Sequence, residues 1–299
     1  MTPLPPAGEP DGGSAAPGDG EGTVRWRLDI AYDGSGFHGF AAQRGIRTVS
    51  GELAEAVSRV ARVPVTITCA GRTDTGVHAQ GQVVHIDLPA EAAARLEPAT
   101  LVRSCNRQLG PAVVVRRAGP AAAGFDARHS ATARRYRYLV VNAPTPDPLL
   151  AGVAWHVIEP LDLRTMAAAA DALLGEHDFR AFCRRVPGTT AEDPIPRRVT
   201  DTRWYATTVD DLGDRAGRAG RAGRAALVPS EGRLLAFEIE ANAFCHQMVR
   251  SIVGTLVDVG MGRKRASDIL WILRSADRGQ ASQPAPPHGL CLMAVRYGD

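Results

Sequence analysis

The sequence predicts an α+β protein made of two ferredoxin-like halves, each with the element order β-α-β-β-α-β. The chain has 299 residues, of which 44% are hydrophobic, so it can bury the core of one large or two smaller domains. Segments that alternate hydrophobic and polar residues follow segments of helical period, and this order recurs after residue 124. We therefore expect two antiparallel sheets side by side with a wide central cleft between them.

The first half spans residues 23–124 and contains one complete unit. Both of its helices are expected on one face of a four-stranded sheet. The hydrophobic periodicity predicts, in order, a strand at Val24–Tyr32, a helix at Ser50–Arg62, strands at Pro64–Cys69 and Gln82–Leu88, a helix at Pro98–Gln108 and a strand at Ala112–Arg117.

The second half spans residues 125–299 and repeats the order with additions. A short strand near Trp155 and a short helix at Ala266–Arg274 are the added elements. The repeated elements are a strand at Ala133–Val141, a helix at Leu163–Leu174, strands at Arg198–Val209 and Arg233–Ala241, a helix at Phe244–Val259 and a strand at Leu290–Tyr297.

Two segments have biased composition. Residues 1–22 consist mostly of Gly, Pro, Ala and acids, which cannot bury enough apolar surface to offset chain entropy, so they predict a disordered tail. Asp214–Ala226 repeats Arg-Ala-Gly between two predicted strands and indicates a flexible basic insertion near residues 210–230. This insertion is either a solvated linker or an accessory contact for phosphate.

The arginine-rich composition is compatible with nucleic-acid binding. The formal net charge is +3, and Lys264 is the only lysine among 35 basic residues. The planar guanidinium group of arginine binds phosphate and stacks on bases. A GC-rich genome would also raise the arginine content, because it favours arginine codons. The sequence has no run of about 18 apolar residues and no signal peptide pattern, so we expect a cytoplasmic protein with no membrane span.

The cysteines predict neither a disulfide framework nor a zinc site. There are five, an odd number, and they are scattered with no C-x-x-C pair. We therefore expect reduced and mostly buried thiols.

Asp74 lies in the loop CAGRTDTGVHAQG, between two predicted strands. Three glycines bracket it and permit close backbone approach, and Arg72 or another arginine would hold its carboxylate as an anion. An Asp in such a loop also fits a simple Asx-turn or a helix cap. Asp74-Thr-Gly76 matches the aspartic protease signature, but that chemistry needs a second such carboxylate, and Arg72 would prevent the two from sharing a proton.

The motifs around this loop resemble those of a known family. Ala70–Ala79 (AGRTDTGVHA) with Gly81–His85 closely resembles the signature of the TruA family, the tRNA pseudouridine synthase A enzymes. The resemblance covers essentially residues 24–298. It extends through Ala31–Gly34 (AYDG), Thr48–Leu53 (TVSGEL), Phe125–Tyr138 (FDARHSATARRYRY) and Ala241–Gly254 (ANAFCHQMVRSIVG).

The resemblance implies a pseudouridine-synthase core and a specific reaction. Family members isomerise uridine to pseudouridine at positions 38, 39 and 40 of the tRNA anticodon stem-loop, so tRNA is the expected partner. The base is cut from the ribose at N1, turned and rejoined through C5, which requires no cofactor, and no metal site is expected. The resemblance also implies a homodimer.

Four residues receive roles from this resemblance. The catalytic aspartate falls on Asp74, the expected nucleophile, and the sequence leaves open whether it attacks the ribose C1′ or the base C6. The tyrosine that stacks on substrate falls on Tyr136, and the arginine that pairs with the aspartate falls on Arg250, so the site would close across the cleft. Arg72 is the candidate for phosphate contact. On pattern alone, Tyr136 also fits an ordinary half-buried strand and Arg250 a solvated helix surface.

Other polar residues receive weaker assignments. Tyr138 shares a strand face with Tyr136 and is expected in the core. His78 and His85 are interpreted as buried or backbone-bonded imidazoles rather than general bases. Two basic groups are expected to hold tRNA phosphates, although a solvated surface would explain the second as well: Arg128, Arg134, Arg135 and Arg137, and Arg263, Lys264 and Arg265.

The sequence departs from the family pattern at three places, none of which includes Asp74, Tyr136 or Arg250. These are Phe37–Gln43, where Phe40 replaces a tryptophan, Leu109–Val113, and Gly289–Leu292, where Cys291 replaces a tyrosine. They leave tRNA choice and docking open. A non-catalytic RNA-binding relative is the second hypothesis, which the presence of Asp74 disfavours.

Overall fold

The computed structural model describes residues 22–184, 193–209 and 232–298. The predicted tail, apart from Gly22, and the whole Arg-Ala-Gly segment at 214–226 lie outside the described residues.

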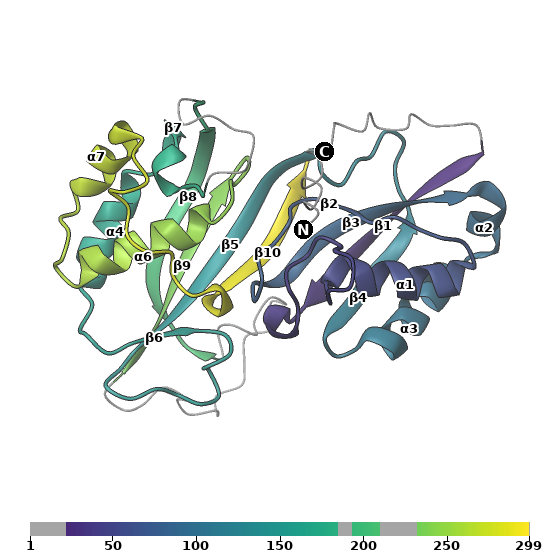
Figure 1. The fold of residues 1–299 in the computed structure, drawn as a ribbon, viewed down its shortest axis with the longest axis horizontal. Helices are drawn as coiled ribbons and strands as arrows, with labels where there is room; N and C mark the ends of the chain where they lie inside the picture. The colour runs from purple at the N-terminus through teal and green to yellow at the C-terminus, as the bar shows by residue number, and fades with distance from the viewer. Residues whose placement is uncertain (1–21, 185–192, 210–231, 299) are drawn as a thin grey trace, which may run out of the picture.

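The described strands form one continuous sheet (Figure 1). Its strand order is β4-β1-β3-β10-β5-β9-β8-β7, with β2 beside β3 and β6 beside β5. The strands are β1 (Thr23–Tyr32), β2 (Thr68–Cys69), β3 (His78–Pro89), β4 (Val113–Pro120), β5 (Ala131–Asn142), β6 (Trp155–Val157), β7 (Gly175–Asp178), β8 (Pro196–Thr207), β9 (Arg233–Ala241) and β10 (Leu290–Tyr297).

The expectation of two separate sheets is wrong because β10 joins the two halves. β10 pairs antiparallel with β5 and parallel with β3, where Cys291 faces His78 and Leu292 faces Ala79. Gly81 permits this close seam, since a Cβ there would lie 2.3 Å from the Met293 carbonyl oxygen. The two halves therefore share one sheet, and their relative position is fixed by hydrogen bonds.

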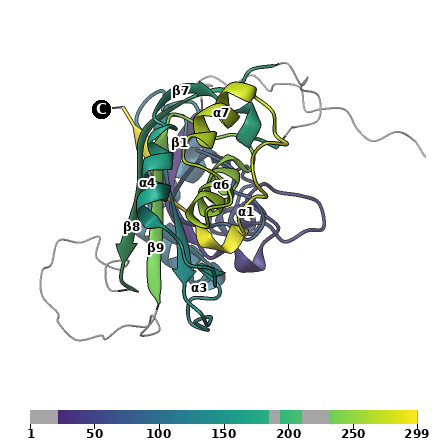
Figure 2. The same cartoon turned by 90° about the vertical axis from the view of Figure 1, so that its left-hand side faces the viewer.

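The longer helices α1 and α6 cover one face of this sheet (Figures 1 and 2). Helix α1 begins after Thr48, whose side chain accepts a hydrogen bond from the Gly51 amide. Helix α6 is buried on nearly every side. The described helices are α1 (Val49–Ala61), α2 (Ala90–Arg95), α3 (Pro98–Leu109), α4 (Leu163–Asp171), α6 (Met248–Gly260) and α7 (Asp268–Ser275), with short 3-10 turns at Gly34–Gly36, Arg180–Phe182 and Pro287–Gly289. Among them, none is long and apolar enough to cross a membrane.

Several element boundaries differ from the prediction. The strand expected at Pro64–Cys69 pairs with β3 only at Thr68 and Cys69, so β2 is short. The helix expected from Phe244 begins only at Met248, because Gln247 adopts a left-handed conformation with φ 63° that a helix cannot contain. Helix α2 and strand β7 were not expected. Strands β9 and β10 have the predicted bounds.

Candidate active site

A cleft of about 1390 Å³ lies between the two halves, lined by the loop before β3 and by the turn that leads into α6. Among the described residues that line it, Asp74 is the only acid. Six arginines of the described ranges line it as well: Arg72, Arg128, Arg134, Arg184, Arg197 and Arg250. The cleft thus surrounds one carboxylate with positive charge, which favours an anionic ligand. Within the described part of the chain, no group of three His, Cys, Asp or Glu side chains could hold a metal ion.

Asp74 contacts two side chains of the opposite half. Its Oδ2 lies 3.3 Å from Nη1 of Arg250, and its Oδ1 lies 3.4 Å from Nε2 of His246. Arg250 is fixed in turn, because its Nε donates to the Ala285 carbonyl at 2.8 Å. The Asp74 side chain is 25% exposed, so the carboxylate is held in place and still open to a ligand.

Buried polar groups support the loop that carries Asp74. The hydroxyl groups of Tyr32 and Thr73 share a hydrogen bond of 2.8 Å, and the Phe40 amide donates to the Thr73 carbonyl at 3.0 Å. The fully buried Gln82 donates to the Gly71 carbonyl at 2.7 Å. Burial raises the pKa of Tyr32 well above its usual value, so the phenol that hydrogen-bonds to Thr73 stays uncharged. The backbone on either side of Asp74 is therefore anchored.

Arg134 joins both halves beneath the cleft. It is 9% exposed, and its guanidinium donates to the carbonyl oxygens of Ala70, Arg128, Ala131 and Asn242 at 2.7–3.0 Å. A guanidinium with this many backbone partners has few donors left for phosphate. The expectation of a phosphate contact at Arg134 is therefore wrong, and its role in the structure is to tie the start of the Asp74 loop to β5 and to the end of β9.

The other arginines predicted near Tyr136 differ in their position relative to the cleft. Arg135 points away from the cleft and pairs with Glu240 at 2.9 Å, so it is not available to phosphate in the cleft. Arg137 is not among the residues that line the cleft. Arg128 is exposed and lines the cleft. Arg135 and Arg137 share one face of β5, opposite to Arg134 and Tyr136, because successive side chains of a strand point to opposite faces, whereas Arg128 lies in the turn before β5.

Tyr136 lies at the base of the cleft on β5. It is 7% exposed and meets Phe244 edge to face, with ring centroids 5.0 Å apart. Burial raises the pKa of Tyr136 above its usual value, and the nearby charge of Asp74 raises it further, so the side chain is a neutral phenol. Tyr138 is fully buried and donates to the Pro286 carbonyl at 2.7 Å, which confirms its place in the core.

Arg72 lies two residues before Asp74, is exposed and lines the cleft. Its phosphate contact stays a prediction. In the second basic group, Arg263 pairs with Glu159 at 3.0 Å, and the ammonium of Lys264 donates to the Gln280 carbonyl at 3.1 Å. Both residues thus have partners within the protein, although the Arg263 side chain is exposed, and their phosphate contact stays a prediction.

The two histidines near the loop are backbone-bonded, as predicted. Nε2 of His78 donates to the carbonyl oxygens of Gly152 and His288 at 3.1 and 3.0 Å. Nδ1 of His85 accepts a hydrogen bond from the Ala127 amide at 3.0 Å. Both side chains are buried and neither lines the cleft. The histidine that does reach Asp74 is His246, to which the sequence analysis assigned no role.

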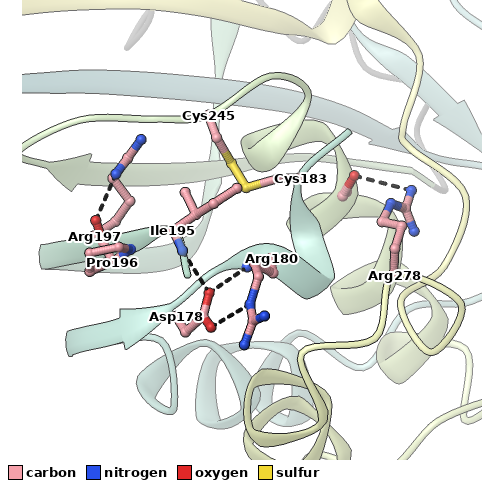
Figure 3. The surroundings of a disulfide bond; sticks show 9 residues. Asp178, Arg180, Cys183, Ile195, Pro196, Arg197, Cys245 and Arg278 are labelled. Atoms are coloured by element: carbon pink, nitrogen blue, oxygen red, sulfur yellow. Dashed lines mark hydrogen bonds and ion pairs between the residues drawn. A yellow bond between two sulfur atoms is a disulfide. The ribbon is translucent and has the colours of Figure 1, made fainter. Parts of the chain in front are cut away.

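Figure 3 shows a disulfide, one cysteine of which, Cys245, lines the cleft. It joins Cys183 to Cys245 with a Cα–Cα distance of 5.7 Å, so the expectation of reduced thiols is wrong for this pair. Sequence spacing could not reveal it, because the two cysteines are 62 residues apart and only the fold brings them together. Cys69 and Cys105 are free and buried, as expected, and burial raises the pKa of each to about 11.

Further hydrogen bonds anchor the chain next to this disulfide. Asp178 accepts from the backbone and side chain of Arg180 and from the Ile195 amide (Figure 3). On the other side, the Arg184 amide donates to the His246 carbonyl at 2.9 Å. The turn that contains Cys245 and His246 is thus attached to the chain around Cys183.

Fold and site together define the class of this protein. A mixed α/β fold with one large, mostly antiparallel sheet is consistent with a pseudouridine synthase, as is a cleft in which Asp74 is the only carboxylate among the described lining residues. A family model described as tRNA pseudouridine synthase matches residues 169–298.

Three relatives, each named tRNA pseudouridine synthase A, match along most of the chain. The protein of Frankia casuarinae is 44% identical over 281 residues, which cover 93% of this chain and 90% of the relative. That of Streptomyces griseus is 42% identical, covering 92% and 89%, and that of Idiomarina loihiensis is 39% identical, covering 92% and 93%. The chain belongs to the tRNA pseudouridine synthase A family, an enzyme family that isomerises uridine in tRNA, which confirms the prediction from its motifs.

Proposed function

We propose that this protein converts uridine to pseudouridine at positions 38, 39 and 40 of the tRNA anticodon stem-loop. The observation that carries the proposal is the position of Asp74, the only acid among the described residues of an arginine-lined cleft and the partner of Arg250. A polyanionic RNA fits such a cleft, and a single fixed carboxylate fits a reaction with one nucleophile.

The reaction rearranges one nucleotide without adding or removing atoms. The N1–C1′ bond breaks, the uracil turns within the site, and a C5–C1′ bond forms while the proton of C5 is lost and N1 gains one. Asp74 is the nucleophile, which attacks a carbon of the bound nucleotide, C1′ of the ribose or C6 of the base. Arg250 orients this carboxylate through their ion pair.

The target base must leave the stem-loop to reach Asp74, and Tyr136 provides the surface that receives it. Unstacking a base costs a few kcal/mol, of which stacking on an aromatic ring returns about 1–3 kcal/mol. The edge-to-face contact with Phe244 supports a fixed ring orientation for Tyr136. Arg72 and Arg128 hold the flanking phosphates, a role that their exposure at the cleft supports.

Two broader proposals rest on the family resemblance and the topology. We infer that the enzyme acts as a cytoplasmic homodimer, as the resemblance implies. We also infer that residues 23–124 and 125–299 are two ferredoxin-like units. The neighbour orders β4-β1-β3-β2 and β10-β5-β9-β8 support this, because each places the four strands of one half in the same spatial sequence.

The proposed function is tested by mapping pseudouridine in an unmodified tRNA transcript after incubation with the enzyme. The wild type should convert uridines 38–40, and Asp74→Ala should bind the tRNA yet convert none. Asp171→Ala, an exposed acid at the end of α4, is the matched control and should keep full activity. Conversion by Asp74→Ala at the normal rate would show that the site is wrong, and no conversion by the wild type would show that the function is wrong.

A further inference from the structure

The two oxygen atoms of Asp74 have different partners. Oδ2 faces Arg250 at 3.3 Å and Oδ1 faces His246 at 3.4 Å. Rotation about the last bond of an aspartate side chain has broad minima, so a contact with one oxygen leaves the plane of the carboxylate free to turn. A second contact with the other oxygen restricts that plane.

His246 is held in an unusual turn. It lies between Cys245, which is fixed by the disulfide to Cys183, and Gln247, a non-glycine residue in the left-handed region at φ 63°. The His246 carbonyl accepts a hydrogen bond from the Arg184 amide at 2.9 Å. Left-handed non-glycine residues are costly and concentrate at functional sites, where surrounding contacts maintain them. Here the maintained feature is the direction of the His246 side chain towards Asp74.

His246 is also the more accessible of the two partners. Its side chain is 37% exposed, compared with 14% for Arg250, and it lines the cleft. A side chain this exposed contributes little to the core, so its replacement creates no buried cavity.

We propose that His246 is a positioning residue for the nucleophile: its Nε2–H engages Oδ1 of Asp74 and, together with Arg250, sets the plane of the carboxylate that attacks the nucleotide. The proposal rests on the proposed function of Asp74 and extends it to a residue outside the inferred catalytic pair. It assigns to His246 an effect on the rate of the chemical step and none on tRNA affinity.

The test compares His246→Ala with His246→Gln, whose side-chain amide supplies an N–H donor at a similar reach. The matched control is His177→Ala, because His177 lies on β7 and does not line the cleft. The measurements are the single-turnover rate of pseudouridine formation with enzyme in excess, the dissociation constant for the same tRNA, and the melting temperature.

We expect the rate of His246→Ala to fall by about 10- to 100-fold, the scale of a misplaced reacting group. Its tRNA affinity and melting temperature should match the wild type, His246→Gln should recover most of the lost rate, and His177→Ala should be unaffected.

A normal rate in His246→Ala would overturn the proposal, as would weaker tRNA binding at an unchanged rate, which would make His246 a substrate contact. Equal loss in the Ala and Gln variants would overturn the donor role. An inactive wild type would instead reject the proposed function, so the two failures are distinguishable.

Discussion

The carboxylate of Asp74 and the guanidinium of Arg250 lie 3.3 Å apart although 176 residues separate them in the sequence. Asp74 comes from the loop before β3, and Arg250 from the helix that packs on the other half. The seam between β3 and β10 keeps these elements at a fixed distance. The candidate site therefore exists only when both halves are folded onto their common sheet.

Arg250→Lys should lower the rate of pseudouridine formation at least about tenfold, because a lysine ammonium cannot replace a planar guanidinium that contacts two partners on different sides. Arg250 uses Nη1 for Asp74 and Nε for the Ala285 carbonyl at the same time. Single-turnover kinetics measure the effect, with Arg59→Lys, an exposed arginine of α1, as the control. A rate near that of the wild type would mean that positive charge alone is sufficient at this position.

Sequence reasoning predicted most of the fold because periodicity is a local property. The bounds of β9 and β10 were predicted correctly. The single sheet was missed because it depends on a two-residue parallel pairing between Leu292 and Cys291 of β10 and the start of β3, more than 200 residues earlier in the chain. No local pattern contains such a pairing, and it changes two expected sheets into one.

The candidate site was only partly predictable for a similar reason. Family motifs point to Asp74, Tyr136 and Arg250, which all line the cleft. The contact of His246 with Asp74 depends on the left-handed turn at Gln247, which hydrophobic spacing does not signal. The burial of Arg134 depends on which carbonyls surround it, and a run of alternating arginines looks the same whether its members bind phosphate or backbone.

Arg134→Met should lower the free energy of unfolding by about 3 kcal/mol or more, because four backbone carbonyls beneath the cleft lose a charged donor. Urea unfolding followed by tryptophan fluorescence measures this. Arg135→Met is the matched control on the opposite face, where Glu240 keeps Arg296 as a partner, and it should cost about 1 kcal/mol or less. Equal losses in the two variants would contradict a special role for Arg134.

The disulfide predicts a definite number of reactive thiols. Of the five cysteines, Cys183 and Cys245 are bonded, so alkylation of the denatured protein without reductant should modify three cysteines, and alkylation after reduction should modify five. In the chain-entropy description, a cross-link over 62 residues stabilises the fold by up to about 4 kcal/mol. Cys183→Ser should therefore lower the melting temperature of the oxidised protein. Modification of all five cysteines without reductant would refute the pairing.

The pH dependence of stability should contain a contribution from His85. Burial lowers the pKa of His85, and the charge of Arg25 lowers it further, while Asp126 and Asp87 oppose the shift and His129 adds to it. The imidazole is neutral when its Nδ1 accepts from the Ala127 amide. Because the folded pKa lies below the unfolded value of about 6.5, the unfolded chain binds the proton first as the pH falls.

The stability that His85 contributes is thus complete above about pH 6.5 and is lost as the pH falls towards its lower folded pKa. His85→Gln keeps an acceptor for the Ala127 amide but removes the titration. Urea unfolding at several pH values from 8 to 5 should show the wild type losing stability relative to His85→Gln as the pH falls. Since the other histidines titrate equally in both proteins, their effects cancel in this difference. A difference that stays constant over the range would show that the proton on His85 is not linked to folding.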